Sequence, residues 1–71
     1  MIYALNIVFT RAGKEALCDL NIGRFDNMEA CIKHRDLCLK QPPKLLIEVA
    51  GALIEHLQIL PQSNYIIKVE E

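Results

Sequence analysis

The first part of the chain alternates between apolar and polar residues, which predicts a β-hairpin over residues 2–10 and 15–24. Period-two alternation places successive side chains on opposite faces of a strand, so one face of each strand can be buried. A four-residue loop over 11–14, with Gly13 supplying a positive φ, would align the two apolar faces. The expected pairs are Phe9–Ala16, Ile7–Cys18, Leu5–Leu20 and Tyr3–Ile22 on the apolar face, and Thr10–Glu15, Val8–Leu17, Asn6–Asp19 and Ala4–Asn21 on the other.

A helix is expected directly after the hairpin. Asp26 is of a residue type that caps helix N-termini, and Glu29 three residues later completes a capping-box pattern. The helix should end near Gln41, because each residue of Pro42-Pro43 disfavours helical geometry in the residue before it. Its apolar stripe at helical spacing consists of Met28, Cys31, Ile32, Cys38 and Leu39.

The segment over residues 44–60 admits two interpretations. A polar stripe opposite an apolar one favours a helix, but Gly51 would weaken its middle by about 1 kcal/mol. Residues 56–60 alternate like a strand instead. We therefore expect, in order, a helix over 44–54, a short strand over 56–60, a turn over 61–64 and a final strand over 65–70.

These elements predict a single small α+β domain over residues 1–71, in the order β-β-α-α-β-β. Hairpins beside helices favour an antiparallel sheet with the helices packed on one face. The chain is 52% hydrophobic, which is rich for a domain with so thin a core. Either the core uses nearly every apolar side chain, or apolar surface remains for a partner or a second copy. We favour the second interpretation.

The charge and hydropathy of the chain limit the classes of partner that we expect it to bind. The formal net charge is −1, so the chain has no positive field to hold a phosphate backbone, and we expect no nucleic-acid partner. The apolar N-terminal run lacks a basic flank and stops at Arg11, so we expect no signal peptide. Glu48 and Glu55 interrupt the longest apolar stretch. We therefore expect a cytoplasmic protein without membrane contact.

The residues that could carry chemistry form no recognisable set. Cys18, Cys31 and Cys38 are odd in number, and reduced, buried thiols account for them. Cys31, His34 and Cys38 could supply metal ligands from one helix, but the close ligand pairs of structural zinc sites are absent. Ser63 lies in an expected turn rather than in a nucleophile motif. We expect no catalytic residue, no metal and no cofactor.

The first forty residues combine an apolar run over 4–9, Gly13, a second run over 18–23 and a helix start over 25–31. This pattern resembles that of a group of small enterobacterial and prophage proteins that have no assigned activity. The resemblance implies an origin in a phage or mobile element, whose small proteins often bind and block a host protein. Pro42-Pro43 and the apolar segment that follows depart from the pattern.

The leading hypothesis is a non-enzymatic protein-binding module, an accessory protein that inhibits or modulates a bacterial host complex such as a defence nuclease. The alternative is a homodimeric structural or regulatory protein of the antitoxin type. The hairpin face turned away from the helices is the expected partner-binding surface, unless solvent or the second apolar segment covers it. Its residues are Asn6, Val8, Leu17, Asp19 and Asn21.

Overall fold

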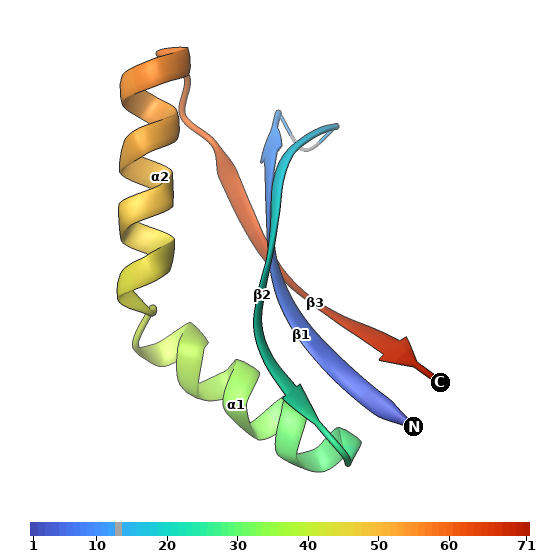
Figure 1. The fold of residues 1–71 in the computed structure, drawn as a ribbon. Coiled ribbons are helices and arrows are strands. Elements are labelled where there is room, and N and C mark those ends of the chain that lie inside the picture. The colour runs from blue at the N-terminus through green and yellow to red at the C-terminus, as the bar shows by residue number, and fades with distance from the viewer. Residues whose placement is uncertain (13) are drawn as a thin grey trace.

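The computed structural model describes residues 1–12 and 14–71. Within them, two strands are followed by two helices and a third strand (Figure 1). This order and the antiparallel sheet agree with the predicted small α+β domain. The predicted strand over 56–60 is wrong, because the second helix continues to Leu57. The elements are β1 (Ile2–Arg11), β2 (Glu15–Phe25), α1 (Met28–Lys40), α2 (Lys44–Leu57) and β3 (Gln62–Glu70).

β1 is the central strand of the sheet, which has the order β2-β1-β3. β3 runs antiparallel to β1 in an unbroken register from Ile2↔Glu70 to Thr10↔Gln62. The two ends of the chain therefore lie side by side (Figure 1). β3 begins at Gln62, within the expected turn, because β1 offers hydrogen-bond partners along that whole length.

The hairpin register differs from the predicted one. Ile7 lies opposite Leu20 rather than Cys18, and Cys18 lies opposite Phe9. The loop is one residue shorter than expected, with Arg11 opposite Glu15, and a bulge at Leu17 adds a second residue of shift. A shift of two residues keeps the same side chains on the same face. The predicted positive φ of Gly13 lies outside the described residues, and Ala12 has a φ of 52°.

A second bulge in β2 sits at Ile22, next to Gly23. A Cβ at Gly23 would lie 3.0 Å from the Phe25 ring, so the absence of a side chain lets this ring fold back over the strand. The Phe25 ring in turn lies against the His34 ring of α1, with the ring centroids 5.4 Å apart and the ring planes tilted by 43°. Gly23 and Phe25 thereby join the end of β2 to the helix.

The N-cap of α1 is Asn27, not Asp26. The backbone N–H of Ala30 donates to the Asn27 side-chain oxygen at 2.8 Å, and the Asn27 backbone is extended, as a cap requires. The helix therefore begins at Met28, one residue later than an Asp26 cap would give. Asp and Asn are almost equally good caps, so the residue types at 26 and 27 did not decide between them.

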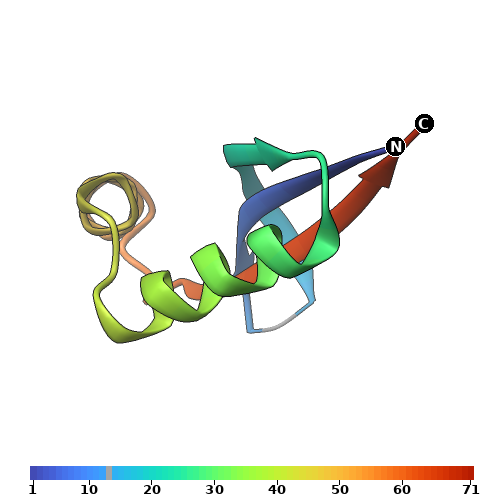
Figure 2. The ribbon, with the colours of Figure 1, turned by 90° about the horizontal axis from the view of Figure 1, so that it is seen from below.

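α2 is one continuous helix of 14 residues despite Gly51 in its middle. It ends at Leu57, and the C-cap Gln58 still donates its N–H to the Ile54 carbonyl at 2.8 Å while its left-handed backbone (φ 54°) turns the chain out of the helix. None of its residues is buried. In Figure 2, α2 is seen end-on and stands apart from the strands. The predicted packing of both helices on one face of the sheet is not confirmed.

The core within the described residues is small and lies between β1 and α1. Leu5, Ile7 and Phe9, which alternate along β1, are completely buried. The Cα radius of gyration is 12.7 Å, against about 11 Å expected for a domain of this length. The chain is therefore less compact than a typical domain of its size. The buried residues of the core are Leu5, Ile7, Phe9, Cys31 and Cys38, and Ala4 is buried on the opposite face of the sheet.

The cap assignment can be tested by two neighbouring substitutions. Asn27→Ala should lower the free energy of unfolding by about 0.5–2 kcal/mol, because it frees the Ala30 amide. The melting temperature should fall by about 4–8 °C per kcal/mol, measured by circular dichroism. Asp26→Ala is the matched control and should change stability by less than about 0.5 kcal/mol. A larger loss for Asp26→Ala than for Asn27→Ala would contradict the assignment.

Candidate protein interface

One face of the sheet presents a set of neighbouring polar and apolar side chains, and we call it the open face. On β1 its members alternate with the buried residues, because side chains point to opposite faces in turn. The register brings Asp19 and Asn64 beside Val8, and brings Asn21 and Ile66 beside Asn6. The open face consists of Asn6, Val8 and Thr10 of β1, Asp19 and Asn21 of β2, and Asn64, Ile66 and Lys68 of β3.

Three of the five predicted partner-binding residues form one hydrogen-bonded cluster on the open face. The Asn6 side-chain amide donates to Asp19 Oδ1 at 2.7 Å. Asn21 Nδ2 donates to Asn6 Oδ1 at 3.0 Å and to the Gly23 carbonyl at 3.1 Å. Asn6 and Asn21 are register partners, whereas Asp19 reaches Asn6 diagonally. The bulged strand β2 is thus tied to β1 by side chains as well as by the backbone.

The other two predicted residues do not form the expected pair. Val8 is half-buried and lies opposite Asp19. Leu17 sits in the first bulge and has no register partner on β1, so the predicted Val8–Leu17 contact across the ladder is absent there. The exposed apolar side chain among the open-face residues of β3 is Ile66, at 40% of its full exposure.

Lys68 completes the cluster, and the sequence reasoning missed it. Lys68 Nζ lies 2.5 Å from Asp19 Oδ2, so β3 is tied to β2 across the central strand. A second ion pair, Arg24–Glu70 at 3.4 Å, joins the same two strands. Ala4 lies between Arg24 and Lys68 in the register and is only 3% exposed, because the two long stems can cover it. The alternation over residues 65–70 predicts that the side chains of Lys68 and Ile67 point to opposite faces of the strand. Only the pairing of β3 with β1 shows that Lys68 lies near Asp19.

A second exposed surface is the apolar side of α2. Ile47 is 62% exposed and Ile54 is 43% exposed, although both are large apolar side chains. They are seven residues apart, which is two helical turns, so they share one face. Leu45 and Leu57 are also exposed. The charged side of the helix carries Lys44 and Glu48, whose charged groups lie 3.8 Å apart.

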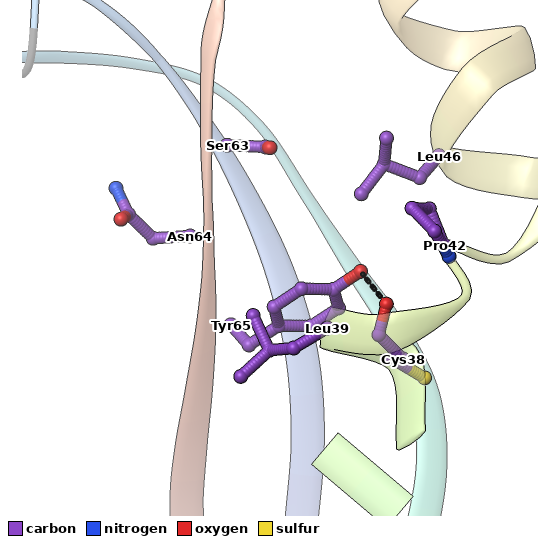
Figure 3. Close-up of a pocket in the computed structure, with 7 residues that line it drawn as sticks. All are labelled: Cys38, Leu39, Pro42, Leu46, Ser63, Asn64 and Tyr65. Atoms are coloured by element: carbon purple, nitrogen blue, oxygen red, sulfur yellow. Dashed lines mark hydrogen bonds between the residues drawn. The ribbon is translucent and has the colours of Figure 1, made fainter. Parts of the chain in front are cut away.

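A pocket of about 280 Å³ lies where the end of α1, the proline linker and the start of β3 meet (Figure 3). The Tyr65 hydroxyl points to the Cys38 carbonyl, 3.4 Å away, while Asn64 points to the other side of β3. Burial, with a smaller effect of Cys38, raises the pKa of Tyr65. The Tyr65 hydrogen bond therefore joins β3 to α1 at this pocket. Its residues are Cys38, Leu39, Pro42, Leu46, Ser63, Asn64 and Tyr65.

The two thiols of α1, Cys31 and Cys38, are buried. Burial raises the pKa of Cys31, although Arg35 acts weakly in the opposite direction, and burial also raises the pKa of Cys38. The reactive thiolate form is therefore disfavoured at both positions. Cys18 is free but only half-buried. No group of three or more His, Cys, Asp or Glu side chains that could hold a metal ion occurs among residues 1–12 and 14–71.

Comparison of the chain with known protein families, curated proteins and solved structures gives no match. Function must therefore be argued from the chain's own residues. Over the same described ranges, no helix combines the length and apolarity that crossing a bilayer would take.

Native alkylation should distinguish the three thiols. Cys18 should react with iodoacetamide before Cys31 and Cys38, because those two are buried and have raised pKa values. Peptide mapping by mass spectrometry after short exposure measures the order. All three should react together once the protein is unfolded in denaturant. Equal rates in the native protein would mean that α1 does not cover the sheet.

The ion pair between Lys68 and Asp19 should be visible in a titration. The pKa of Asp19 is lowered from its usual 3.8, first by the Lys68 hydrogen bond and then by that of Asn6. A lowered folded-state pKa means that the stabilisation is present above pH 3.8 and is lost as the pH falls through the lowered value. Lys68→Met keeps the stem over Ala4 and removes the donor, so the Asp19 pKa should rise.

Carboxyl-carbon NMR measures this pKa directly. Lys33→Met on α1 removes the same charge from another surface and is the matched control. An Asp19 pKa that responds equally to both substitutions would show a general charge effect instead of the pair.

Proposed function

We propose that this chain is a non-catalytic protein-binding module that contacts its target through the open face. The observation that supports this is the cross-strand cluster of Asn6, Asp19, Asn21 and Lys68, whose polar groups are held by one another while exposed to solvent. Side chains already fixed on a sheet lose little further conformational freedom when a partner binds. Such a surface is preorganised for recognition.

The composition of the open face favours a protein partner over a nucleic acid. The two ion pairs, Lys68–Asp19 and Arg24–Glu70, each combine one positive and one negative side chain, so their charges cancel. A phosphate backbone would need a surplus of positive charge. Ile66 and Val8 add apolar area between the polar groups, and protein interfaces combine an apolar centre with a polar rim in this way.

The proposed target is a bacterial host complex, such as a defence nuclease, which the chain would inhibit or modulate as an accessory protein of a phage or mobile element. The resemblance of the hairpin and helix start to small prophage proteins supports this choice of target. Inhibition by binding needs a rigid surface and no reactive group, which suits the fixed side chains of the open face and the raised thiol pKa values of α1.

The role of the open face in binding can be tested by introducing the same positive charge on two different surfaces. Ile66→Lys introduces a positive charge beside Asn6, at the centre of the open face. Leu37→Lys makes the same change at a 61% exposed apolar residue of α1 and is the matched control. Both proteins and the unmodified chain are tagged and used to capture partners from a bacterial lysate. A captured protein is then purified, and its affinity for each variant is measured by calorimetry.

The expected result is a partner that binds the unmodified chain and Leu37→Lys equally, and binds Ile66→Lys at least about 10-fold more weakly. Circular dichroism must show that both variants remain folded. Partners that tolerate Ile66→Lys but not Leu37→Lys would place the interface on α1 and contradict the proposal.

A further inference from the structure

The folded chain exposes more surface than a self-sufficient domain of its mass. Its accessible surface is 5035 Å², whereas a monomeric protein of 8.1 kDa exposes about 4,500 Å². The excess of about 500 Å² is of the order of the roughly 800 Å² that each partner contributes to a stable interface. Four of the twelve exposed large apolar side chains of the described residues lie on α2, which has no buried residue.

We propose that α2 packs against α2 of a second copy of this chain, antiparallel and about a two-fold axis. Cyclic two-fold dimers are the commonest oligomers, and their interfaces must be self-complementary. Packing of this kind buries the apolar surface that the monomer leaves exposed. Self-association through α2 is independent of target binding through the open face, because the two surfaces share no residue.

The spacing of the apolar residues on α2 fits such an axis. In an antiparallel pair centred between Ala50 and Gly51, Ile47 of one copy lies opposite Ile54 of the other, and the contact occurs twice. Gly51 is exposed, and a Cβ added to it would meet nothing within 4 Å. The residues nearest the axis are therefore small, which lets the two helices approach closely at their midpoint.

The charges on α2 suit the antiparallel direction. Lys44 stands at the start of the helix and Glu55 near its end, on the same side of the helix by their spacing of eleven residues. In the antiparallel pair, Lys44 of each copy lies two residues, or about 3 Å along the helix axis, from the level of Glu55 in the other copy. A parallel pair would instead place Lys44 at the level of Lys44 and Glu55 at the level of Glu55. Opposite charges at both ends of the interface favour the antiparallel arrangement.

Sedimentation equilibrium tests the association. The unmodified chain should sediment at twice 8.1 kDa, and its apparent mass should fall on dilution. Ile47→Asp should weaken the dimer at least about 100-fold, because the substitution enters the interface twice. Leu37→Asp alters an equally exposed apolar residue on α1 and should leave the dimer intact. Ile47 is too exposed for the substitution to unfold the monomer, which circular dichroism verifies.

A particle of 8.1 kDa at a concentration of about 1 mM would overturn the dimer. So would a dimer that Ile47→Asp and Leu37→Asp weaken equally, because its interface could not be centred on α2. Neither outcome affects the partner-capture experiment with Ile66→Lys. The experiments can therefore contradict target binding while supporting the dimer, or contradict the dimer while supporting target binding.

Disulfide trapping tests the orientation, in a Cys18→Ser background that leaves only buried native thiols. Gly51→Cys should cross-link two copies rapidly under mild oxidation, because position 51 lies next to the axis. Lys44→Cys should not, because its two copies would be separated by thirteen helical residues, or about 20 Å, against a Cα limit near 7 Å. Cross-linking at both positions would indicate a parallel pair and overturn the antiparallel arrangement.

Discussion

The pairing of β3 with β1 is the contact on which the remainder of the domain depends. It makes β1 a central strand, and a central position allows Leu5, Ile7 and Phe9 to be completely buried. Ile7 and Tyr65 are 58 residues apart in sequence, against 13 for Ile7 and Leu20 in the hairpin. Closing the longer loop costs only about 1.3 kcal/mol more. Burying one large side chain contributes about 1.5–3 kcal/mol, so the long-range contact is easily sustained.

The faces of the sheet could be predicted, whereas the detailed register could not. Alternation depends only on the side-chain period of a strand, and a shift of two residues preserves it. This explains why Asn6, Asp19 and Asn21 were correctly assigned to one face even though their partners were wrong. The bulge at Leu17 leaves no mark in the apolar pattern. Lys68 could be placed only once β3 was known to lie beside β1.

For the helices, too, the features that depend on local sequence could be predicted, whereas those that depend on long-range contacts could not. Pro42-Pro43 ends α1 and precedes α2, as local backbone geometry requires. The alternation over residues 56–60 favoured a strand, but the hydrogen bonds of α2 continue through its last turn to Gln58. The helix therefore outweighs a period-two pattern of only five residues. The surplus of apolar residues was visible in the composition, and part of it is exposed on α2.

The position of β3 also has a consequence for how the protein is made. Of the five described elements, β1 leaves the ribosome before the others, and its neighbour β3 leaves after them. During synthesis, the hairpin and both helices are therefore exposed before the third strand can pair. Throughout that interval β1 has one unpaired edge, which can pair with other extended chains. The sheet can therefore be completed only after β3 has left the ribosome.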